Sequence, residues 1–585
     1  MSDYTNIINR LRTKIGPISL EEILLLQENI ELSAGWRPGA VARLVSDELA
    51  DMGTPVTRWG NTITRATMQQ AIDDTAAAGI ELSAPGNMAL ILDGPLYARD
   101  GLRLRLPPTA RIIRGWDGGT SFGSGIITQE NWAANAKISN VHIYGGIWEG
   151  SGLLGRVIEF YGDDWLIDGV YVDGWGTVAD GSMGILCIGD RFRVRHTTFR
   201  NPGADAGSDC IHIAGGSNWL VEDVDGDASD DIVGIFPIKP QISVPAGCAN
   251  QNILDGVVKN VRGTSAKARL VGCGLHLPEL TCDIRRISIS NVRGVSSNTI
   301  YQGIVVRRED ASPGTIQSIE LRDLRYSCTA STGGVLAIER VEDVLVDGVD
   351  LRGGTMSGLN ITGCKRVTVR NAHIDASTGT VAIQALSAAS EDLVIEDSYL
   401  SCGSGDGIKI GTASTIAITR GAVRRTQIIN IADSQRGIAF ENAINFTTER
   451  TVCARLSGAT STIGFRETSS SSGLRFIDND LSAVDTPIQN RQPASTRYRN
   501  NAGYVTEATV AVTITSGNTA SSATAHGLSF TPAAANVVSI TPTSVGRATT
   551  GVRVSAFDAT NITLTSDTAA SGGNATFNVR LSLGV

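Results

Sequence analysis

GSDCIHIAGGSNWLVEDVDGDASDDIVGIFP (Gly207–Pro237) contains the pattern that decides the fold of this chain. Apolar residues alternate with other residues in CIHI and in IVGI, and this period of two is typical of β-strands. Gly-Gly, Ser-Asn and an Asp-Gly pair at Asp225 separate the runs, and such residues are typical of turns. The stretch therefore predicts short strands joined by tight corners.

The same pattern returns from Ile138 to about Tyr498. One apolar anchor marks each copy, and neighbouring anchors are 23 to 34 residues apart: Val141, Ile167, Val194, Val221, Ile253, Ile287, Ile319, Val346, Val369, Ile395, Ile418, Phe446 and Phe476. Self-similarity at this period indicates a solenoid or another repeat architecture. Because each unit is strand-sized, we expect a coil of β-strands with long outer faces on which an extended polymer can lie.

Composition narrows the classes of partner. The net charge is -9 at neutral pH, and the chain lacks a basic stretch that could neutralise phosphates, so nucleic acid is not expected as a partner. No run of 18 apolar residues is present, so we expect no membrane insertion. The N-terminus MSDYTNIINRLRTK lacks the apolar core of a secretory signal peptide.

The nine cysteines are spread along the chain without a CxxC pair. The sequence predicts that they are small buried apolar residues, while a Cys248–Cys273 or Cys273–Cys282 disulfide stays open. No metal site and no cofactor are predicted.

Shifts in composition divide the chain into four parts. Residues 1–60 predict a helical attachment module, with a capped helix at Ser19–Leu32 and a second candidate in RPGAVARLVSDELADMG. Residues 61–115 predict a capping helix, TMQQAIDDTAAAG, that ends at Gly79 and leads into the first strands of the coil. Residues 116–503 predict the coil itself. Residues 504–585 alternate with period two and predict an antiparallel β-sandwich of about six to eight strands.

This layout resembles a bacteriophage tailspike of the pectin-lyase-like superfamily, and the segment GNTASSATAHGLSFTPAAANVVSITPTS resembles the C-terminal sandwich of many phage tail proteins. The resemblance implies a mainly β fold: a right-handed parallel β-helix with a small N-terminal helical module and a C-terminal antiparallel β-sandwich, which would serve trimerisation or glycan binding. It also implies a homotrimer, made in the bacterial cytoplasm without a signal peptide and placed in the virion tail. The N-terminus would bind a tail or baseplate protein, and the coil would bind or cleave a host surface polysaccharide.

Three aspartates are the candidate catalytic residues. Asp209 precedes the strand CIHI, and Asp230 and Asp231 precede the strand IVGI. The separation of Asp209 and Asp230, 230 − 209 = 21 residues, is about one rung, and strands on neighbouring rungs lie about 4.8 Å apart. We therefore expect these carboxyls to lie close together, where mutual repulsion favours one protonated acid beside an ionised carboxylate. Since alternation would send Asp230 and Asp231 to opposite faces, the hypothesis requires them to lie at a corner.

The passage is similar to the catalytic region of polygalacturonase-type glycosidases. That resemblance implies that Asp230 is the general acid and that Asp209 and Asp231 activate water for hydrolysis with inversion. It is partial, because Gly207-Ser208 stands where the family has Asn-Thr, and PIKPQISVPAGCANQN is inserted where the family has a histidine on the next rung. The family's Arg-x-Lys pair has no clear match.

Other polar and aromatic residues are candidates for substrate binding. His212 alternates with Ile211 and Ile213 and should face outward, and aromatic rings such as that of Trp219 offer flat faces to sugars. Two charged clusters follow the aspartates, and arginine can grip acidic sugars with its forked donors, although salt-bridged surface residues are the commoner outcome. The candidates are His212, Trp219, His276, Glu279, Arg285, Arg307 and Arg308.

The sequence is compatible with three functions. The first is a tailspike depolymerase that cleaves host polysaccharide by glycoside hydrolysis. The second is a non-catalytic receptor-binding or structural tail spike, which binds the glycan without shortening it. The third is a polysaccharide lyase that acts by β-elimination.

Overall fold

The computed structural model describes residues 54–583 with short gaps, and the statements below concern these residues. The gaps are residues 61, 120, 131, 135, 177–181, 203–207, 241–243, 298–300, 310, 330–333, 355–356, 377–380, 387–389, 413–416, 491–495 and 545–548. The two helices predicted in residues 1–60 lie outside the described residues. Two compact units make up the chain, one of residues 1–229 and 240–251 and the other of residues 230–239 and 252–585.

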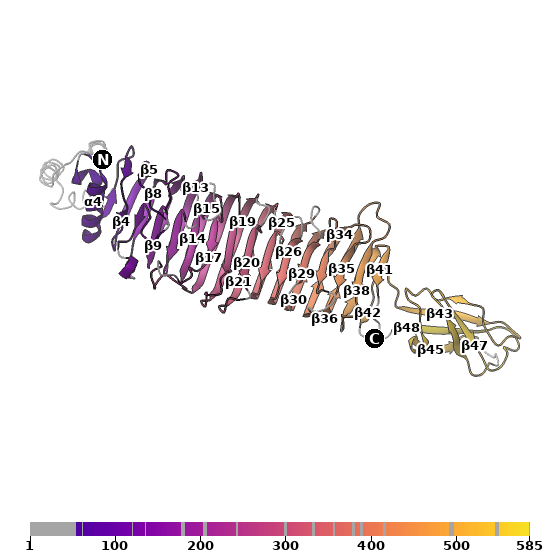
Figure 1. The fold of residues 1–585 in the computed structure, drawn as a ribbon. Helices are drawn as coiled ribbons and strands as arrows, with labels where there is room; N and C mark the ends of the chain where they lie inside the picture. The colour runs from indigo at the N-terminus through magenta and orange to yellow at the C-terminus, as the bar shows by residue number, and fades with distance from the viewer. Residues whose placement is uncertain are drawn as a thin grey trace, which may run out of the picture. The chain divides into compact units, whose positions relative to one another are not determined.

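A short helix begins the described part of the first unit. Helix α4 (Arg65–Ala78) starts at Thr64, whose hydroxyl accepts a hydrogen bond from the amide of Thr67, and ends at Gly79 in the left-handed conformation with φ of 69°. This confirms the helix and the glycine stop that the sequence predicts. Its buried face, which includes Met68 and Ile72, packs on the first strands of the unit, and the short 3-10 helix η1 (Val56–Trp59) precedes it (Figure 1).

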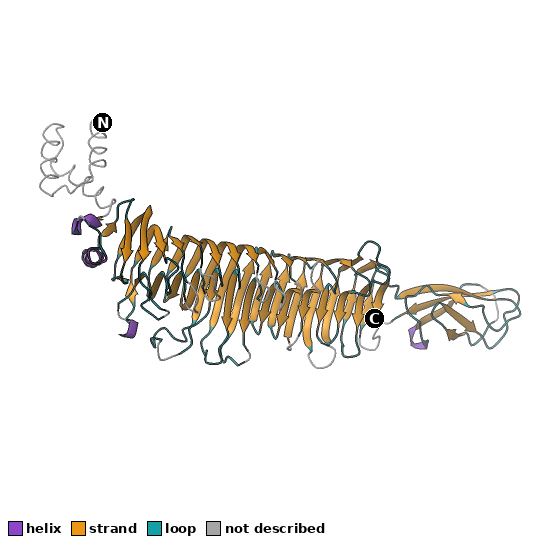
Figure 2. Ribbon diagram, turned by 45° about the horizontal axis from the view of Figure 1, so that its top comes forward, coloured by secondary structure: helices purple, strands orange, loops and turns teal. Residues whose placement is uncertain are grey.

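Parallel strands build the rest of the first unit, in two main runs of stacked strands (Figure 2). Ile167, Val194 and Val221 are aligned across neighbouring strands, so these predicted anchors form one core column. The first run comprises β1 (Thr54–Pro55), β2 (Glu81–Ser83), β3 (Ala89–Leu92), β5 (Arg103–Arg114), β8 (His142–Glu149), β10 (Leu166–Asp168), β11 (Tyr171–Asp173), β13 (Arg193–Arg200) and β15 (Leu220–Ala228). The second comprises β4 (Leu96–Tyr97), β6 (Ile127–Thr128), β9 (Ile158–Asp163), β12 (Ile185–Ile188) and β14 (Ile211–Ser217), with β7 (Ile138–Ser139) and the 3-10 helix η2 (Trp132–Ala134) beside them.

The second unit is built in the same way. Val346, Val369 and Ile395 are aligned across three strands and are buried, as the sequence predicts. One run comprises β17 (Ile253–Ser265), β19 (Ile284–Ser296), β21 (Ile316–Arg322), β22 (Arg325–Cys328), β24 (Glu342–Asp347), β25 (Asp350–Gly353), β27 (Lys365–Arg370), β28 (His373–Asp375), β30 (Ser390–Glu396), β31 (Tyr399–Ser401), β33 (Ile418–Arg424), β34 (Gln427–Ile431), β36 (Ala443–Glu449), β37 (Val452–Arg455), β39 (Arg475–Ile477), β40 (Asp480–Ala483) and β42 (Arg497–Arg499). The other comprises β16 (Val233–Ile235), β18 (Val271–Leu275), β20 (Ile304–Arg308), β23 (Leu336–Glu339), β26 (Ser357–Thr362), β29 (Val381–Ala385), β32 (Ile408–Ile410), β35 (Arg436–Phe440), β38 (Ile463–Glu467) and β41 (Thr486–Gln489). These coils confirm the right-handed parallel β-helix, the handedness that parallel crossovers adopt.

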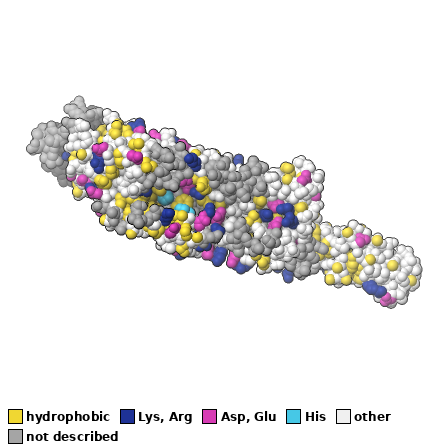
Figure 3. Space-filling view, viewed as in Figure 1, with side chains coloured by type: hydrophobic (Ala, Val, Ile, Leu, Met, Phe, Trp, Pro, Cys, Tyr) yellow, Lys and Arg dark blue, Asp and Glu magenta, His cyan; other side chains and the backbone are white. Residues whose placement is uncertain are grey.

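Charged side chains of neighbouring rungs pair along the surface of the coil. Acidic and basic side chains lie side by side on the face seen in Figure 3. In the second unit, Arg420 contacts Asp392 at 2.7 Å and Arg425 contacts Asp397 at 2.6 Å. All four residues have φ between 47° and 58°, so they occupy left-handed corner positions. Asparagines also pair between rungs, because Asn291 donates to Asn260 over 2.7 Å.

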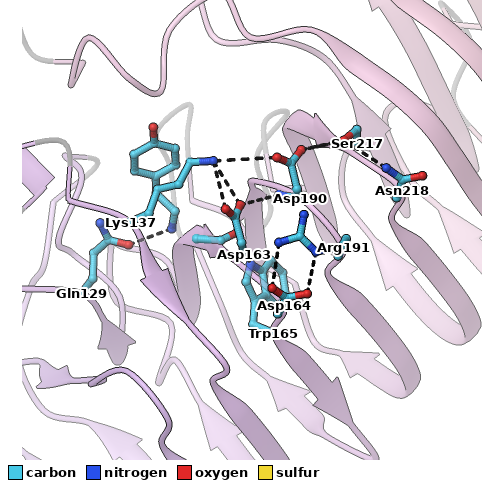
Figure 4. A network of polar contacts seen from close by, with 11 residues as sticks. Gln129, Lys137, Asp163, Asp164, Trp165, Asp190, Arg191, Ser217 and Asn218 are labelled. Atoms are coloured by element: carbon cyan, nitrogen blue, oxygen red, sulfur yellow. Dashed lines mark hydrogen bonds and ion pairs between the residues drawn. The ribbon is translucent and has the colours of Figure 1, made fainter.

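A four-residue corner recurs on three rungs of the first unit, as GDDW from Gly162, GDRF from Gly189 and GSNW from Gly216. Figure 4 shows the polar side chains of these corners: Asp163 and Asp164, Asp190 and Arg191, and Ser217 and Asn218. Asp163 accepts from the amide of Asp190 over 2.9 Å, and Asp190 accepts from the amide of Ser217 over 2.7 Å. The aromatic residue that closes each corner points into the core, where Trp165, Phe192 and Trp219 stack with centroid distances of 4.6 and 5.8 Å. The corners thus bind one rung to the next through hydrogen bonds outside and stacked rings inside.

An antiparallel sandwich ends the second unit. Strands β43 (Glu507–Ile514), β48 (Ala575–Ser582) and β45 (Val537–Pro542) form one sheet, and β44 (Thr524–Ala525), β47 (Asn561–Thr565) and β46 (Arg553–Phe557) form another, with the 3-10 helix η3 (Ala534–Asn536) before β45. Residues of both sheets share one core, which includes Val512, Ile562 and Val579. These sheets confirm the predicted C-terminal sandwich.

The sequence also makes predictions about the state of the cysteines and about membrane-spanning helices. All nine cysteines are buried thiols and not partners in disulfides, and burial raises the pKa of the Cys273 thiol to about 12. In the described part of the chain, no helix is both long and apolar enough to cross a membrane.

Candidate functional site

Asp209 lies in the first unit, directly before β14, and is only 5% exposed. Its carboxylate lies 2.7 Å from Nδ1 of His212, and its backbone carbonyl accepts a hydrogen bond from Nε1 of Trp175 over 3.1 Å. His212 itself is only 9% exposed, so its imidazole is nearly buried against Asp209, a degree of burial that the alternation of apolar residues does not predict. A buried carboxylate bonded to a histidine fixes the orientation of the ring.

Asp230 and Asp231 lie in the second unit, in the bend directly before β16. The hypothesis requires a corner at this point, and the bend provides one. Asp231 is 1% exposed, and its carboxylate accepts from the backbone amide of Arg269 over 3.0 Å and from the Arg269 guanidinium over 3.4 Å. Asp230 is partly exposed, and its backbone carbonyl accepts from the hydroxyl of Ser265 over 2.7 Å. The two neighbours therefore differ in environment, one buried and paired with a cation, the other open to solvent.

Two glycines of β18 make room beside Asp231. A Cβ atom added at Gly272 would lie 2.3 Å from a carboxylate oxygen of Asp231 and 2.7 Å from the ring of Phe236. A Cβ atom at Gly274 would lie 3.0 Å from the same ring. The absence of side chains at Gly272 and Gly274 thus lets the Asp231 carboxylate and the Phe236 ring lie directly against the strand.

Phe236, Arg269 and Tyr301, which the sequence did not identify, form a series of contacts that begins at this carboxylate with Arg269. The Arg269 guanidinium carbon lies 4.7 Å from the ring centroid of Tyr301 and 5.9 Å from that of Phe236. His276, a predicted binding residue, contacts Phe236 edge-on at 5.4 Å. Tyr301 is 40% exposed. The sequence signal for these residues is weak, because only the register of the rungs relates Phe236, Arg269 and Tyr301 to the aspartates.

The other predicted binding residues are dispersed. His276 and Glu279 are exposed in the segment after β18. Arg307 is aligned with Gly274 on one side and Glu339 on the other, and it forms ion pairs with Glu309 and, at 3.2 Å, with Glu339.

Arg308 and Arg285 are held by their own surroundings. Arg308 donates to the backbone carbonyls of Ser312 and Gly314 over 3.3 and 3.4 Å. Arg285 lies on β19, in the other run of strands, where it pairs with Asp283 at 2.8 Å. The structure therefore brings His276 to the Asp231 surroundings and leaves Arg285 on a different run of strands.

Trp219 does not fit the predicted contact with sugar. Its side chain is 1% exposed and stacks on Phe192 in the core of the first unit. A ring buried this deeply has no free face for a ligand, so Trp219 is a packing residue, and the interpretation of it as a substrate-binding residue is withdrawn.

The chemistry open to these residues is that of carboxylic acids. A buried carboxylate held by a cation and a partly exposed neighbour suit the division of work between a base and an acid. Carboxylate oxygens are also the ligands of hard divalent cations, so the expected absence of a metal stays a prediction.

Comparison with solved structures shows what this fold is similar to. A mutant tailspike protein of E. coli bacteriophage HK620 in complex with a pentasaccharide shares 14% identity at a TM-score of 0.53, over 94% of this chain and 96% of that one. The tailspike protein of the same phage, also in complex with a pentasaccharide, shares 14% identity at a TM-score of 0.52, over 94% of this chain and 95% of that one. At this level of identity the likeness shows a shared fold. No protein-family model matches the chain, and no curated protein matches it significantly.

Proposed function

We propose that this protein is a bacteriophage tailspike that binds a host surface polysaccharide and cleaves it by glycoside hydrolysis with inversion. The shared fold with tailspike proteins in complex with a pentasaccharide supports the binding part. The observation that carries the catalytic part is the contrast between Asp231, buried and bound by Arg269, and Asp230, partly exposed in the same bend.

The proposed roles follow from these environments. The Arg269 guanidinium and the backbone amide stabilise the negative charge on Asp231, which suits a base that removes a proton from water. Asp230 is open enough to reach a glycosidic oxygen and give it a proton as the bond breaks. Asp209 of the first unit, whose carboxylate is held by His212, is the third proposed catalytic residue, with a part in activating the water.

The proposed reaction is a single displacement at the anomeric carbon. The water oxygen bonds to the anomeric carbon and loses a proton to the carboxylate base, while the leaving sugar oxygen gains the proton of Asp230. The attack comes from the face opposite the leaving group, so the anomeric configuration inverts.

Assembly and location are part of the same proposal. As a tailspike, the protein would form a homotrimer and occupy the virion tail, and its N-terminal residues 1–60 would bind a tail or baseplate protein. The symmetry of such an assembly would place three copies of each polysaccharide site around one axis.

Reducing-end release from purified bacterial surface polysaccharides tests the catalytic proposal. Asp230→Asn and Asp231→Asn should each lower the rate at least about 100-fold, the usual contribution of one acid or base, while binding persists. Asp323→Asn, at an exposed carboxyl of another corner, is the matched control and should retain the wild-type rate. Unchanged release by both site variants would refute hydrolysis at this bend. Tight binding by the wild type without any release would instead identify a non-catalytic receptor-binding spike.

A further inference from the structure

A cluster of two aromatic rings and one guanidinium adjoins Asp231 in the second unit. Phe236 follows β16, Arg269 precedes β18, and Tyr301 precedes β20, so three successive rungs contribute one residue each. The Arg269 guanidinium lies over both rings, at 5.9 and 4.7 Å from their centroids. We call these three residues the aromatic shelf.

The shelf has the form of a surface that accepts a flat apolar partner. The Phe236 ring lies against strand β18 because Gly272 and Gly274 carry no side chains. Tyr301 remains 40% exposed while it contacts Arg269. Aromatic rings that are fixed in place and open to solvent bind the apolar C–H faces of sugar rings, and the tyrosine hydroxyl adds a hydrogen-bonding group at the edge.

The charges beside the shelf are already neutralised by protein groups. Arg269 lies 3.4 Å from the Asp231 carboxylate, and only 17% of its side chain is exposed. Arg307 contacts both Glu309 and Glu339. A carboxylate on the sugar would have to displace one of these paired carboxylates, and it would meet the negative charge of Asp231 in doing so. A sugar without charge avoids both costs.

We propose that the aromatic shelf is a subsite for an uncharged sugar residue of the polysaccharide, next to the Asp230–Asp231 bend. This inference rests on the proposed function and deepens it, because it names a neutral rather than an acidic sugar at this position. It also replaces the buried Trp219 by Phe236 and Tyr301 as the aromatic residues that contact the glycan.

The test measures binding of the full chain to purified bacterial O-polysaccharides and capsular polysaccharides, some neutral and some carrying uronic acids. Each acidic polysaccharide is assayed before and after chemical reduction of its carboxyl groups. The variants are Tyr301→Ala and Phe236→Ala, with circular dichroism and thermal unfolding as controls of folding. Tyr399→Ala is the matched control, because Tyr399 is 38% exposed on β31, in the other run of strands.

The inference predicts that a neutral polysaccharide, or the carboxyl-reduced form of an acidic one, binds best. Tyr301→Ala, at an exposed position where folding should be unaffected, should weaken this binding at least about tenfold, and Tyr399→Ala should not. Binding that is unchanged in Tyr301→Ala and Phe236→Ala overturns the shelf and leaves the proposed function intact. Binding that is lost on carboxyl reduction overturns the neutral-sugar assignment. Failure of every polysaccharide to bind overturns the proposed function and the shelf together.

Discussion

Asp231 shows, at the scale of single residues, how much a side chain's role depends on the rung beside it. The sequence identifies the aspartate through its position before a strand, but it does not identify Arg269, which lies 38 residues further on. Local pattern predicts strands and corners because alternation and turn residues act over a few positions. Partners across rungs depend on the length of each loop, so Arg269, Phe236 and Tyr301 could not be assigned from the sequence.

Glu159 in the first unit is a second carboxylate, and its buried partners determine its contribution to stability. It is fully buried and accepts from the amide of Gly125, the hydroxyl of Thr128 and the guanidinium of Arg156, at 2.8 to 2.9 Å. Arg114 lies nearby, and burial lowers its pKa to about 10. Glu159 is thus the negative charge that two buried arginines share.

We predict that Glu159→Gln destabilises the protein by about 3 to 5 kcal/mol, because it leaves the buried Arg156 guanidinium without its paired carboxylate. The measurement is urea or thermal unfolding of the full chain. Arg105→Gln, which removes a partly exposed ion pair with Glu81, should cost no more than about 1 kcal/mol and serves as control. Equal losses in the two variants would contradict this account of the buried pair.

At the scale of elements, the repeating corner is what converts a row of short strands into a coil. The sequence predicts the corners through their Gly, Asn and Asp residues, and the structure confirms left-handed backbone at Asp164 and Asn218, while Arg191 adopts it at a residue type that the sequence does not mark. The direction of the aromatic side chain after each corner could not be predicted in the same way. Trp219 was expected at the surface and is in the core, because the corner turns the following residue inward.

Gly216 tests the corner directly. Its φ is 111°, and an added Cβ atom would lie 1.6 Å from the carbonyl oxygen of Gly189 on the preceding rung. We therefore predict that Gly216→Ala lowers the thermal midpoint strongly or prevents folding. At Gly458, with φ of 88°, an added Cβ meets nothing within 4 Å, so Gly458→Ala should cost only about 1 kcal/mol of backbone strain. Similar midpoints for the two variants would show that contact between rungs does not limit the corner.

The corner ion pairs predict how the coil responds to acid. Hydrogen bonds from arginines of the next rung lower the pKa values of Asp343, Asp392 and Asp397 below the ordinary 3.8. Since the folded-state pKa is lowered, this stability is complete above the unfolded-state pKa and is lost as the pH falls through the folded-state values. We expect a thermal midpoint that is flat from neutral pH to about pH 5 and falls below about pH 4.

Asp343→Asn provides the control for this effect. The variant should have a lower midpoint than the wild type at neutral pH and a smaller fall between about pH 4 and pH 3, because its corner no longer titrates. An identical acid profile for variant and wild type would exclude the Arg366–Asp343 pair as a source of the pH dependence.

At the scale of the whole molecule, the fold is specified by pattern more than by identity. The chain shares only 14% of its residues with the HK620 tailspike across nearly its full length. A coil requires apolar residues at alternate strand positions and left-handed residues at corners, and many sequences meet both requirements. The same freedom leaves the outer face unconstrained by the fold, so the site has to be established by its own chemistry.

If the outer face beside Asp231 holds the polysaccharide, a crystal structure of the Asp231→Asn variant with a bound oligosaccharide should show a sugar ring in contact with Phe236 and Tyr301. A glycosidic oxygen should then lie within hydrogen-bonding distance of Asp230. An oligosaccharide bound only to the C-terminal sandwich, with the aromatic shelf unoccupied, would contradict this account.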